Sequence, residues 1–223
     1  MIHAYNDKVG QVRVYCRGVI RLVIRTLFYL IGLFVLSFGI SLTIKSDLGA
    51  GAWDALNVGL STTFGLTVGS WVFIVGIILI AINAWLHKSK PDYLAVITIF
   101  LVGVFIDFWL IQVFGAWIPV GMFFRFVVLL AGMVIMAVGI SAYLQAKFPV
   151  IPIDNLMLGI QNRFKVKMMT AKTIGEVFAL IFALIFKGPI GVGTFIITFG
   201  IGPLIQIFYP RLENLYKKLR HES

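Results

Sequence analysis

Six long apolar stretches constrain this chain more than any other feature of its sequence. They run over residues 26–45, 69–87, 93–114, 124–145, 170–187 and 190–209. Each is close to the roughly 20 residues that an α-helix needs to cross the hydrocarbon core of a bilayer. Hydrophobic residues make up 60% of the chain and charged residues only 13%, which is more apolar surface than a soluble domain of this length can bury. We therefore predict an all-α polytopic membrane protein with about six transmembrane helices.

Two further segments, residues 48–64 and 149–164, are helical in pattern but are shorter and are interrupted by Gly or Pro. If they are re-entrant half-helices, the chain has six spans, and if they cross the membrane it has eight. With six spans and a cytoplasmic N-terminus, all but three of the 19 Lys and Arg residues lie on the cytoplasmic side. Because positive residues concentrate in cytoplasmic loops, this distribution favours six spans and two half-helices.

Both ends of the chain are basic. Residues 1–25 contain four arginines spaced four residues apart, at positions 13, 17, 21 and 25. They precede an apolar run that is too long for a signal-peptide core and has no cleavage site after it. We expect this segment to lie against anionic headgroups at the cytoplasmic face. Residues 210–223 place Leu212, Tyr216 and Leu219 on one helical face and lysines on the others. This pattern predicts a basic, amphipathic cytoplasmic tail.

The chain also repeats itself after a shift of one hundred residues. Ten identities occur in forty ungapped positions, roughly three times the number expected by chance for this composition. The matched pairs include Arg25 with Arg125, Gly32 with Gly132, Gly39 with Gly139, Asp54 with Asp154 and Gly59 with Gly159. Residues 26–114 are therefore predicted to form one membrane repeat and residues 124–209 a second.

Each repeat holds three spans and one half-helix. Because three is odd, the second repeat must enter the membrane from the opposite side to the first. Two inverted three-helix repeats are the architecture of many secondary transporters, in which the site lies near the midplane where broken helices meet. The Asp54 segment would then dip in from outside and the Asp154 segment from the cytoplasm.

Asp54 and Asp154 are candidate solute- or ion-binding residues, since each follows a Gly- or Pro-containing break and begins a helix. A carboxylate in this place can accept hydrogen bonds from the free backbone N–H groups of the helix start. It can equally belong to a polar site for a cation, a proton or a polar solute. The symmetry of the repeat does not decide between these two roles.

Asp107 is a third candidate, because it lies in an otherwise apolar span, where a charge normally faces a cavity or a partner. Its counterpart in the second repeat is Gln206. Asn57 and Asn155 complete the candidate site, while Glu176 is a weaker candidate near the cytoplasmic surface. The five tryptophans lie close to predicted span ends, where an interfacial belt is expected.

No sequence pattern points to an enzyme. The chain lacks zinc-protease, catalytic-triad and phosphate-loop motifs, so we expect no catalytic residue, no metal and no cofactor. The net charge of +10 lies at span ends rather than in a nucleic-acid-binding patch. The expected partners are the lipid bilayer and an unidentified small solute or ion. The Gly-rich helix faces would serve packing within one chain or a homodimer equally well.

The motif GISLTIKSDLGAGAWDALNVG at residues 39–59 resembles the YczE-type bacterial integral membrane proteins, grouped with YyaS- and YitT-like proteins. The resemblance continues through TVGSW at 67–71 to GIGPLIQ at 200–206 and so covers nearly the whole chain. It implies a location in the bacterial cytoplasmic membrane, and it supplies neither a substrate nor functional residues.

Three functions are compatible with these features. The first is a small secondary transporter of a polar or ionic solute, with a site between broken helices. The second is the substrate-binding membrane subunit of a multi-component transporter, which would work with a separate ATPase. The third is a non-transporting scaffold or regulator of a biosynthetic system, which would recruit a soluble enzyme through basic loops such as residues 163–167.

Overall fold

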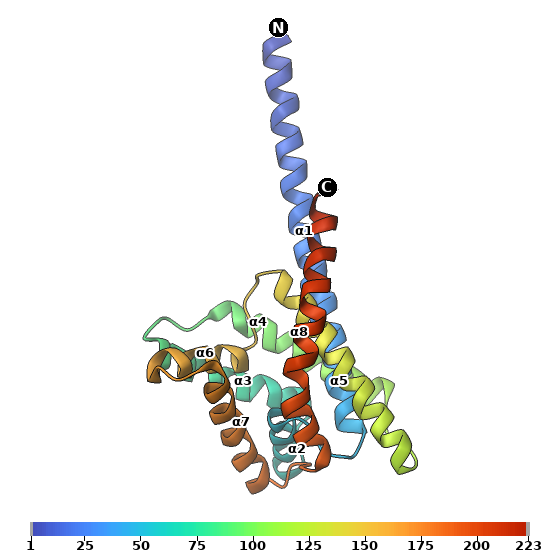
Figure 1. Cartoon of the computed structure of the whole chain (residues 1–223). Coiled ribbons are helices and arrows are strands. Elements are labelled where there is room, and N and C mark those ends of the chain that lie inside the picture. The colour runs from blue at the N-terminus through green and yellow to red at the C-terminus, as the bar shows by residue number, and fades with distance from the viewer. Residues whose placement is uncertain (1, 222–223) are drawn as a thin grey trace.

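The computed structural model describes the backbone of residues 2–221 and the side chains of residues 19–219. This part of the chain is helical throughout and contains no strand. Figure 1 shows the arrangement of its helices. In chain order they are α1 (Ile2–Lys45), α2 (Ala52–Phe64), α3 (Val68–His87), α4 (Tyr93–Asp107), the π-helical turn η1 (Phe108–Val113), α5 (Met122–Gln145), α6 (Pro152–Phe164), α7 (Met168–Ile185) and α8 (Val192–His221). The predicted all-α fold is confirmed.

Six helical segments are long and apolar enough to cross a membrane, as predicted. They are Val19–Lys45, Val68–His87, Tyr93–Val113, Met122–Gln145, Met168–Ile185 and Val192–Leu219. The helices α2 and α6 have 13 residues each. At about 1.5 Å per residue, such a helix covers only about two thirds of a 30 Å hydrocarbon core. The ambiguous segments are therefore short helices and do not span by themselves.

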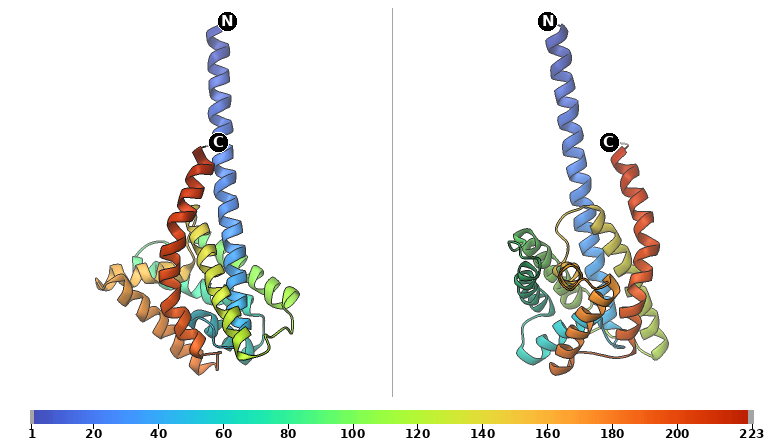
Figure 2. Two further views of the ribbon diagram at one scale, coloured as in Figure 1. Left: turned by 45° about the vertical axis from the view of Figure 1, so that its right-hand side comes forward. Right: turned by 60° about the vertical axis from the view of Figure 1, so that its left-hand side comes forward.

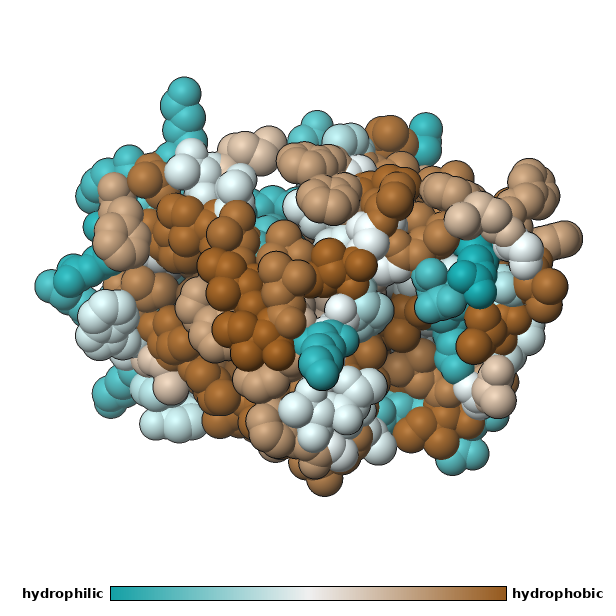
Figure 3. Space-filling model, turned by 90° about the horizontal axis from the view of Figure 1, so that it is seen from below, coloured by the Kyte–Doolittle hydropathy of each residue, from teal (hydrophilic) through white to brown (hydrophobic). Residues whose placement is uncertain are grey.

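The surface of the six segments is that of a protein solvated by lipid. Large apolar side chains point outward along them, for example Phe123 with 74% of its surface exposed and Phe199 with 76%. Figure 3 shows apolar residues over much of the end of the molecule opposite the termini, with several groups of hydrophilic residues among them and at the edges. A soluble protein rarely exposes apolar surface on this scale, so the chain is a membrane protein.

The basic ends of the chain do not form separate helices. Residues 2–25 continue the first span as part of α1, and α8 continues through Pro203 and Pro210 to His221. Both helices project from the same end of the molecule (Figure 1). Tyr216 is only 7% exposed and packs edge-to-face on Phe28, with 5.1 Å between ring centroids. Part of the predicted amphipathic face of the tail therefore contacts α1. The side chains of Arg13 and Arg17 lie outside the described residues.

The helices α1 and α5 run antiparallel and make the most extensive contact between any two helices (Figures 1 and 2). A Cβ atom added to Gly39 would lie 2.7 Å from the carbonyl oxygen of Gly132, and one added to Gly139 would lie 2.9 Å from that of Gly32. Such close approach of two backbones requires residues without side chains. These four glycines are the equivalent pairs of the sequence repeat.

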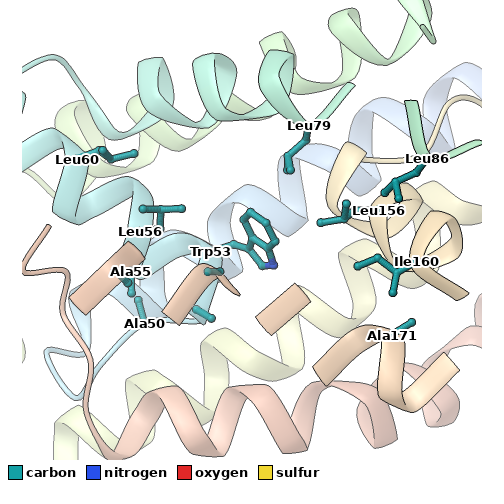
Figure 4. Packing of buried hydrophobic residues seen from close by; sticks show 13 residues of the cluster. Ala50, Trp53, Ala55, Leu56, Leu60, Leu79, Leu86, Leu156, Ile160 and Ala171 are labelled. Carbon is teal, nitrogen blue, oxygen red and sulfur yellow. The ribbon is translucent and has the colours of Figure 1, made fainter. Parts of the chain in front are cut away.

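The short helices pack across the two halves of the chain. α2 lies against α7, and α6 lies against α3. In the first contact Gly59 lies beside the backbone of Gly188, and in the second Gly159 lies beside Leu86 and His87. Figure 4 shows the apolar core that results, which joins α2, α3, α6 and α7 around Trp53. Each half of the chain thus holds the short helix of the other.

We expect Gly139→Ala to lower the free energy of unfolding by about 1–3 kcal/mol, since a methyl group there must push α1 away from α5. Gly175→Ala is the matched control, because no atom lies within 4 Å of the added Cβ. It should change stability by no more than about 0.5 kcal/mol. Thermal unfolding in detergent measures both variants, and equal unfolding temperatures would contradict the importance of this helix contact.

Candidate functional site

Four charged side chains lie in the region where α7 packs against the two short helices, α2 and α6. Asp54 lies on α2, Asp154 on α6, and Lys172 and Glu176 on α7. Glu176 lies within electrostatic range of both Asp54 and Asp154, and Lys172 lies within range of Asp154 and Glu176. Lys172 and Glu176 are four residues apart and so share one face of α7. We call these four residues the charged cluster.

The two aspartates of the charged cluster have different surroundings. Asp154 accepts a hydrogen bond of 2.7 Å from the hydroxyl of Tyr143, which is buried on α5. Asp54 is partly buried and accepts no hydrogen bond within the described part of the chain. Its Oδ2 atom lies 3.0 Å from the position of a Cβ built on Gly51, just before the helix. In the residues described, no backbone N–H of α2 or α6 donates to either carboxylate, so neither aspartate is a hydrogen-bonding helix cap.

Asp107 lies elsewhere. Its carboxylate accepts hydrogen bonds from the hydroxyl of Thr67 at 2.5 Å and from the backbone N–H of Gly69 at 2.8 Å. Asp107 therefore ties the end of α4 to the start of α3, where the backbones of Gly69 and Gly103 are in contact. Across residues 19–219, no hydrogen bond or ion pair joins it to the charged cluster. The sequence correctly indicated that this acid needs a partner, and the partner is a helix N-terminus.

Two buried polar atoms on α2 have no hydrogen-bond partner among the described residues. They are Oδ1 of Asn57 and Nε1 of Trp53. Asn57 has 4% of its surface exposed and Trp53 has 6%. The prediction that Trp53 belongs to an interfacial belt is wrong, because its indole fills the space between α2 and α6 (Figure 4). Trp85 and Trp117 are 71% and 45% exposed, as expected for residues at an interface.

Asn155 and Gln206, the remaining candidates, are not brought to the charged cluster by any described contact. Asn155 lines a small cavity of about 50 Å³ between α3, α6 and the loop before α4. In this cavity His87 Nε2 lies 3.3 Å from the carbonyl oxygen of Asn155, while Asn83 donates a hydrogen bond of 2.8 Å to the carbonyl oxygen of Pro152. Gln206 is exposed on α8.

Lys172, Trp53 and Tyr143 are the residues of this region that the sequence did not indicate. Lys172 was counted only as one more cytoplasmic cation, and Trp53 only as a membrane anchor. The repeat could have indicated that Trp53 is near the site, because Trp53 lies directly before the repeated Asp54 and next to the helix break. Nothing in the spacing of α7 distinguishes Lys172 from other lysines near span ends.

The break before α2 is closed by the loop between α7 and α8. The backbone N–H of Gly193 donates to the carbonyl oxygen of Leu48 at 2.8 Å, and the N–H of Ala50 donates to that of Pro189 at 3.0 Å. Non-helical backbone is tolerated at membrane depth only when protein or a water-filled cavity satisfies its polar groups. Here the other half of the chain satisfies them.

Comparison with known proteins gives similarity over most of the chain. The family described as "Family of unknown function (DUF6198)" matches residues 23–210. The "Uncharacterized protein YyaS" of Bacillus subtilis (strain 168) is 41% identical over 188 residues, which are 84% of this chain and 94% of that protein. The "Uncharacterized membrane protein YczE" of the same strain is 32% identical over 197 residues, 87% of this chain and 89% of its own. No solved structure matches the chain.

Asp107→Ala should lower the free energy of unfolding by about 1.5–3 kcal/mol, because it removes the acceptor of two hydrogen bonds that hold α3 to α4. Asp47→Ala is a suitable control. Asp47 pairs with Arg125 at 2.9 Å, but both side chains are substantially exposed, so its loss should cost about 0–1 kcal/mol. Denaturation of the purified variants in the same detergent would show whether the two losses differ in this order.

Proposed function

Since this chain belongs to the DUF6198 family, whose description assigns no activity, we propose from its own geometry that it is a small secondary transporter of a polar or ionic solute. The resemblance to YczE-type proteins is confirmed by the same comparisons. The observation that carries the proposal is the charged cluster between two short helices from opposite halves of the chain. Ionisable residues within a membrane domain normally serve a solute, ion or proton pathway. Broken helices that meet near the midplane are where secondary transporters bind their solutes.

We further propose that residues 26–114 and 124–209 are inverted repeats, in a cytoplasmic membrane and with both termini in the cytoplasm. Three observations support this arrangement. The first helices of the two halves, α1 and α5, run antiparallel. Their glycine contacts join equivalent positions, and the contact of α2 with α7 is matched by that of α6 with α3. Each relation is what a two-fold axis in the membrane plane would produce.

The two halves differ at one place, and this difference supports alternating access. In the first half α3 packs closely on α4, and Asp107 holds the contact. In the second half the corresponding helices, α7 and α8, pack far less extensively, although Lys172 Nζ on α7 lies 3.9 Å from the position of a Cβ built on Gly202 of α8. Gln206, the counterpart of Asp107, is exposed, and so is Met169, the counterpart of Gly69. We propose that the tightly packed α3–α4 end of the pathway is the closed end in this arrangement and that the loosely packed α7–α8 end is the one that opens.

If the two halves exchanged their packing, so that α7 and α8 came together and α3 and α4 separated, the charged cluster would become accessible from the opposite side of the membrane. In the alternative state α7 would pack on α8, and the start of α3 would leave Asp107. The switch needs no change in the contact between α1 and α5, which would act as the fixed scaffold. Rocking of one part of an inverted-repeat protein against the rest is the usual mechanism of alternating access.

Transport itself can be tested with proteoliposomes on solid-supported membranes, by recording currents after concentration jumps of ethanolamine, glycine and lactate as probes of three charge classes. We expect at least one class to give a current, and Asp54→Asn and Glu176→Gln to lower it at least tenfold, because both remove charge from the cluster. Asp47→Asn, which changes an exposed carboxylate, should keep the full current. Currents that survive in both cluster variants would refute the assignment of the site.

The closed end can be locked covalently. In a Cys16→Ser background, Thr67→Cys with Asp107→Cys should form a disulfide on oxidation, since the two side chains are in hydrogen-bond contact. The lock should abolish transport, and reduction should restore it. Lys167→Cys with Gln206→Cys, the equivalent pair, should crosslink only in molecules whose first pair is open. If both disulfides formed together in one molecule, the two ends would not alternate.

A further inference from the structure

Resting on the proposed transport function, we infer that the solute is a small organic cation that also carries a hydrogen-bond acceptor. It would lie against α2, in contact with Asp54, Asn57 and Trp53, and would face Glu176 on α7. Three independent features of this surface lead to that class of solute: its charge, its unpartnered polar atoms and the place of the indole ring.

The distribution of charge in the cluster favours a cation at its Asp54 end. The cluster has three carboxylates and one ammonium group. Lys172 acts on Asp154 and Glu176, and Asp154 has the hydroxyl of Tyr143 as well. In the described part of the chain, Asp54 has neither a neighbouring ammonium group nor a hydroxyl donor. The charged side chain that interacts with it electrostatically is Glu176, another carboxylate. Two like charges in a poorly solvated region repel strongly, so a cation between Asp54 and Glu176 would be held tightly.

The unpartnered atoms favour an organic cation over a bare proton or a metal ion. Nε1 of Trp53 can only donate a hydrogen bond, and Oδ1 of Asn57 can only accept one. Both are buried and lack partners among the described residues. Native proteins nearly always satisfy such atoms. A proton on Asp54 or a metal ion beside it would leave the indole N–H without an acceptor, whereas an ammonium group linked to a hydroxyl or carbonyl would satisfy both atoms.

These groups form one continuous surface of α2. Asn57 is four residues after Trp53 and three after Asp54, so it lies between them around the helix. In Figure 4 the nitrogen of the Trp53 ring is on the side turned away from Leu79, between α2 and α6. Donor, acceptor and carboxylate therefore lie on one side of α2.

The test is direct binding to the purified full-length protein in lipid nanodiscs, measured by titration calorimetry with matched ligands. Ethanolamine carries the charge and the acceptor, propylamine has the same size without the acceptor, and ethylene glycol lacks the charge. We expect ethanolamine to bind, propylamine to bind about tenfold more weakly, and ethylene glycol not to bind. Asp54→Asn should remove binding of both amines, and Asp47→Asn should leave it unchanged.

Trp53→Phe separates a specific role of the indole N–H from a packing role, since phenylalanine keeps an aromatic ring in the core. It should weaken ethanolamine binding about tenfold and leave propylamine binding unchanged, because only ethanolamine uses the N–H. An equal loss for both amines would overturn the acceptor requirement. Binding of ethylene glycol or lactate at least as tight as that of ethanolamine, or no amine binding to protein that unfolds normally, would overturn the inference altogether.

These outcomes are distinct from failure of the transport function. If lactate or glycine drives a current that depends on Asp54 while amines do not bind, transport stands and the organic-cation inference falls. If amines bind in the expected order but no probe drives a current, the binding site stands and the transport function falls.

Discussion

The contact between the backbones of α1 and α5 is the constraint on which the rest of the structure depends. In a membrane, lipid is as apolar as a helix surface, so close packing rather than hydrophobic burial holds helices together. Glycines at equivalent positions of both helices let their backbones touch. α1 leads directly into the break before α2, and α5 leads into the break before α6. The position of the first pair therefore sets the position of both short helices, each of which is then held by the other half of the chain.

This arrangement brings ionisable groups together from three helices, and all four side chains are partly buried. Asp154 is stabilised by a buried tyrosine and lies near Lys172, while Asp54 has no hydrogen-bond partner among the described residues. The difference between two equivalent aspartates is informative, because a purely structural duplication would have been expected to stabilise them in the same way. Asp107, which has the most complete set of partners, holds two helices together instead. In this protein the best-satisfied acid supports the fold, and the least satisfied one belongs to the binding site that we propose.

Much of the architecture was predictable because it follows from local properties of the chain. The six spans and the two short helices depend on the length of apolar runs, which the bilayer thickness translates directly into structure. Predictions failed where they depended on a neighbour in space. Trp53 was assigned to the interface because it lies near a span end, but α6 and α7 cover it. The tail was expected to be an amphipathic helix, and its pattern did not indicate that Tyr216 would pack on Phe28 from the other end of the chain.

The sequence by itself determined that the chain is a helical membrane protein of the DUF6198 family, that it contains a repeat, and that Asp54 and Asp154 are equivalent. Apolar length and the hundred-residue shift carry this information without reference to any contact. Only the tertiary structure decided that Lys172 and Glu176 join these aspartates, that Asp107 does not, and that Trp53 and Asn57 have unpartnered atoms beside Asp54. The reason is physical: the charge and hydrogen-bond balance of a buried group depends on side chains from distant segments, and their approach is set by how the helices pack.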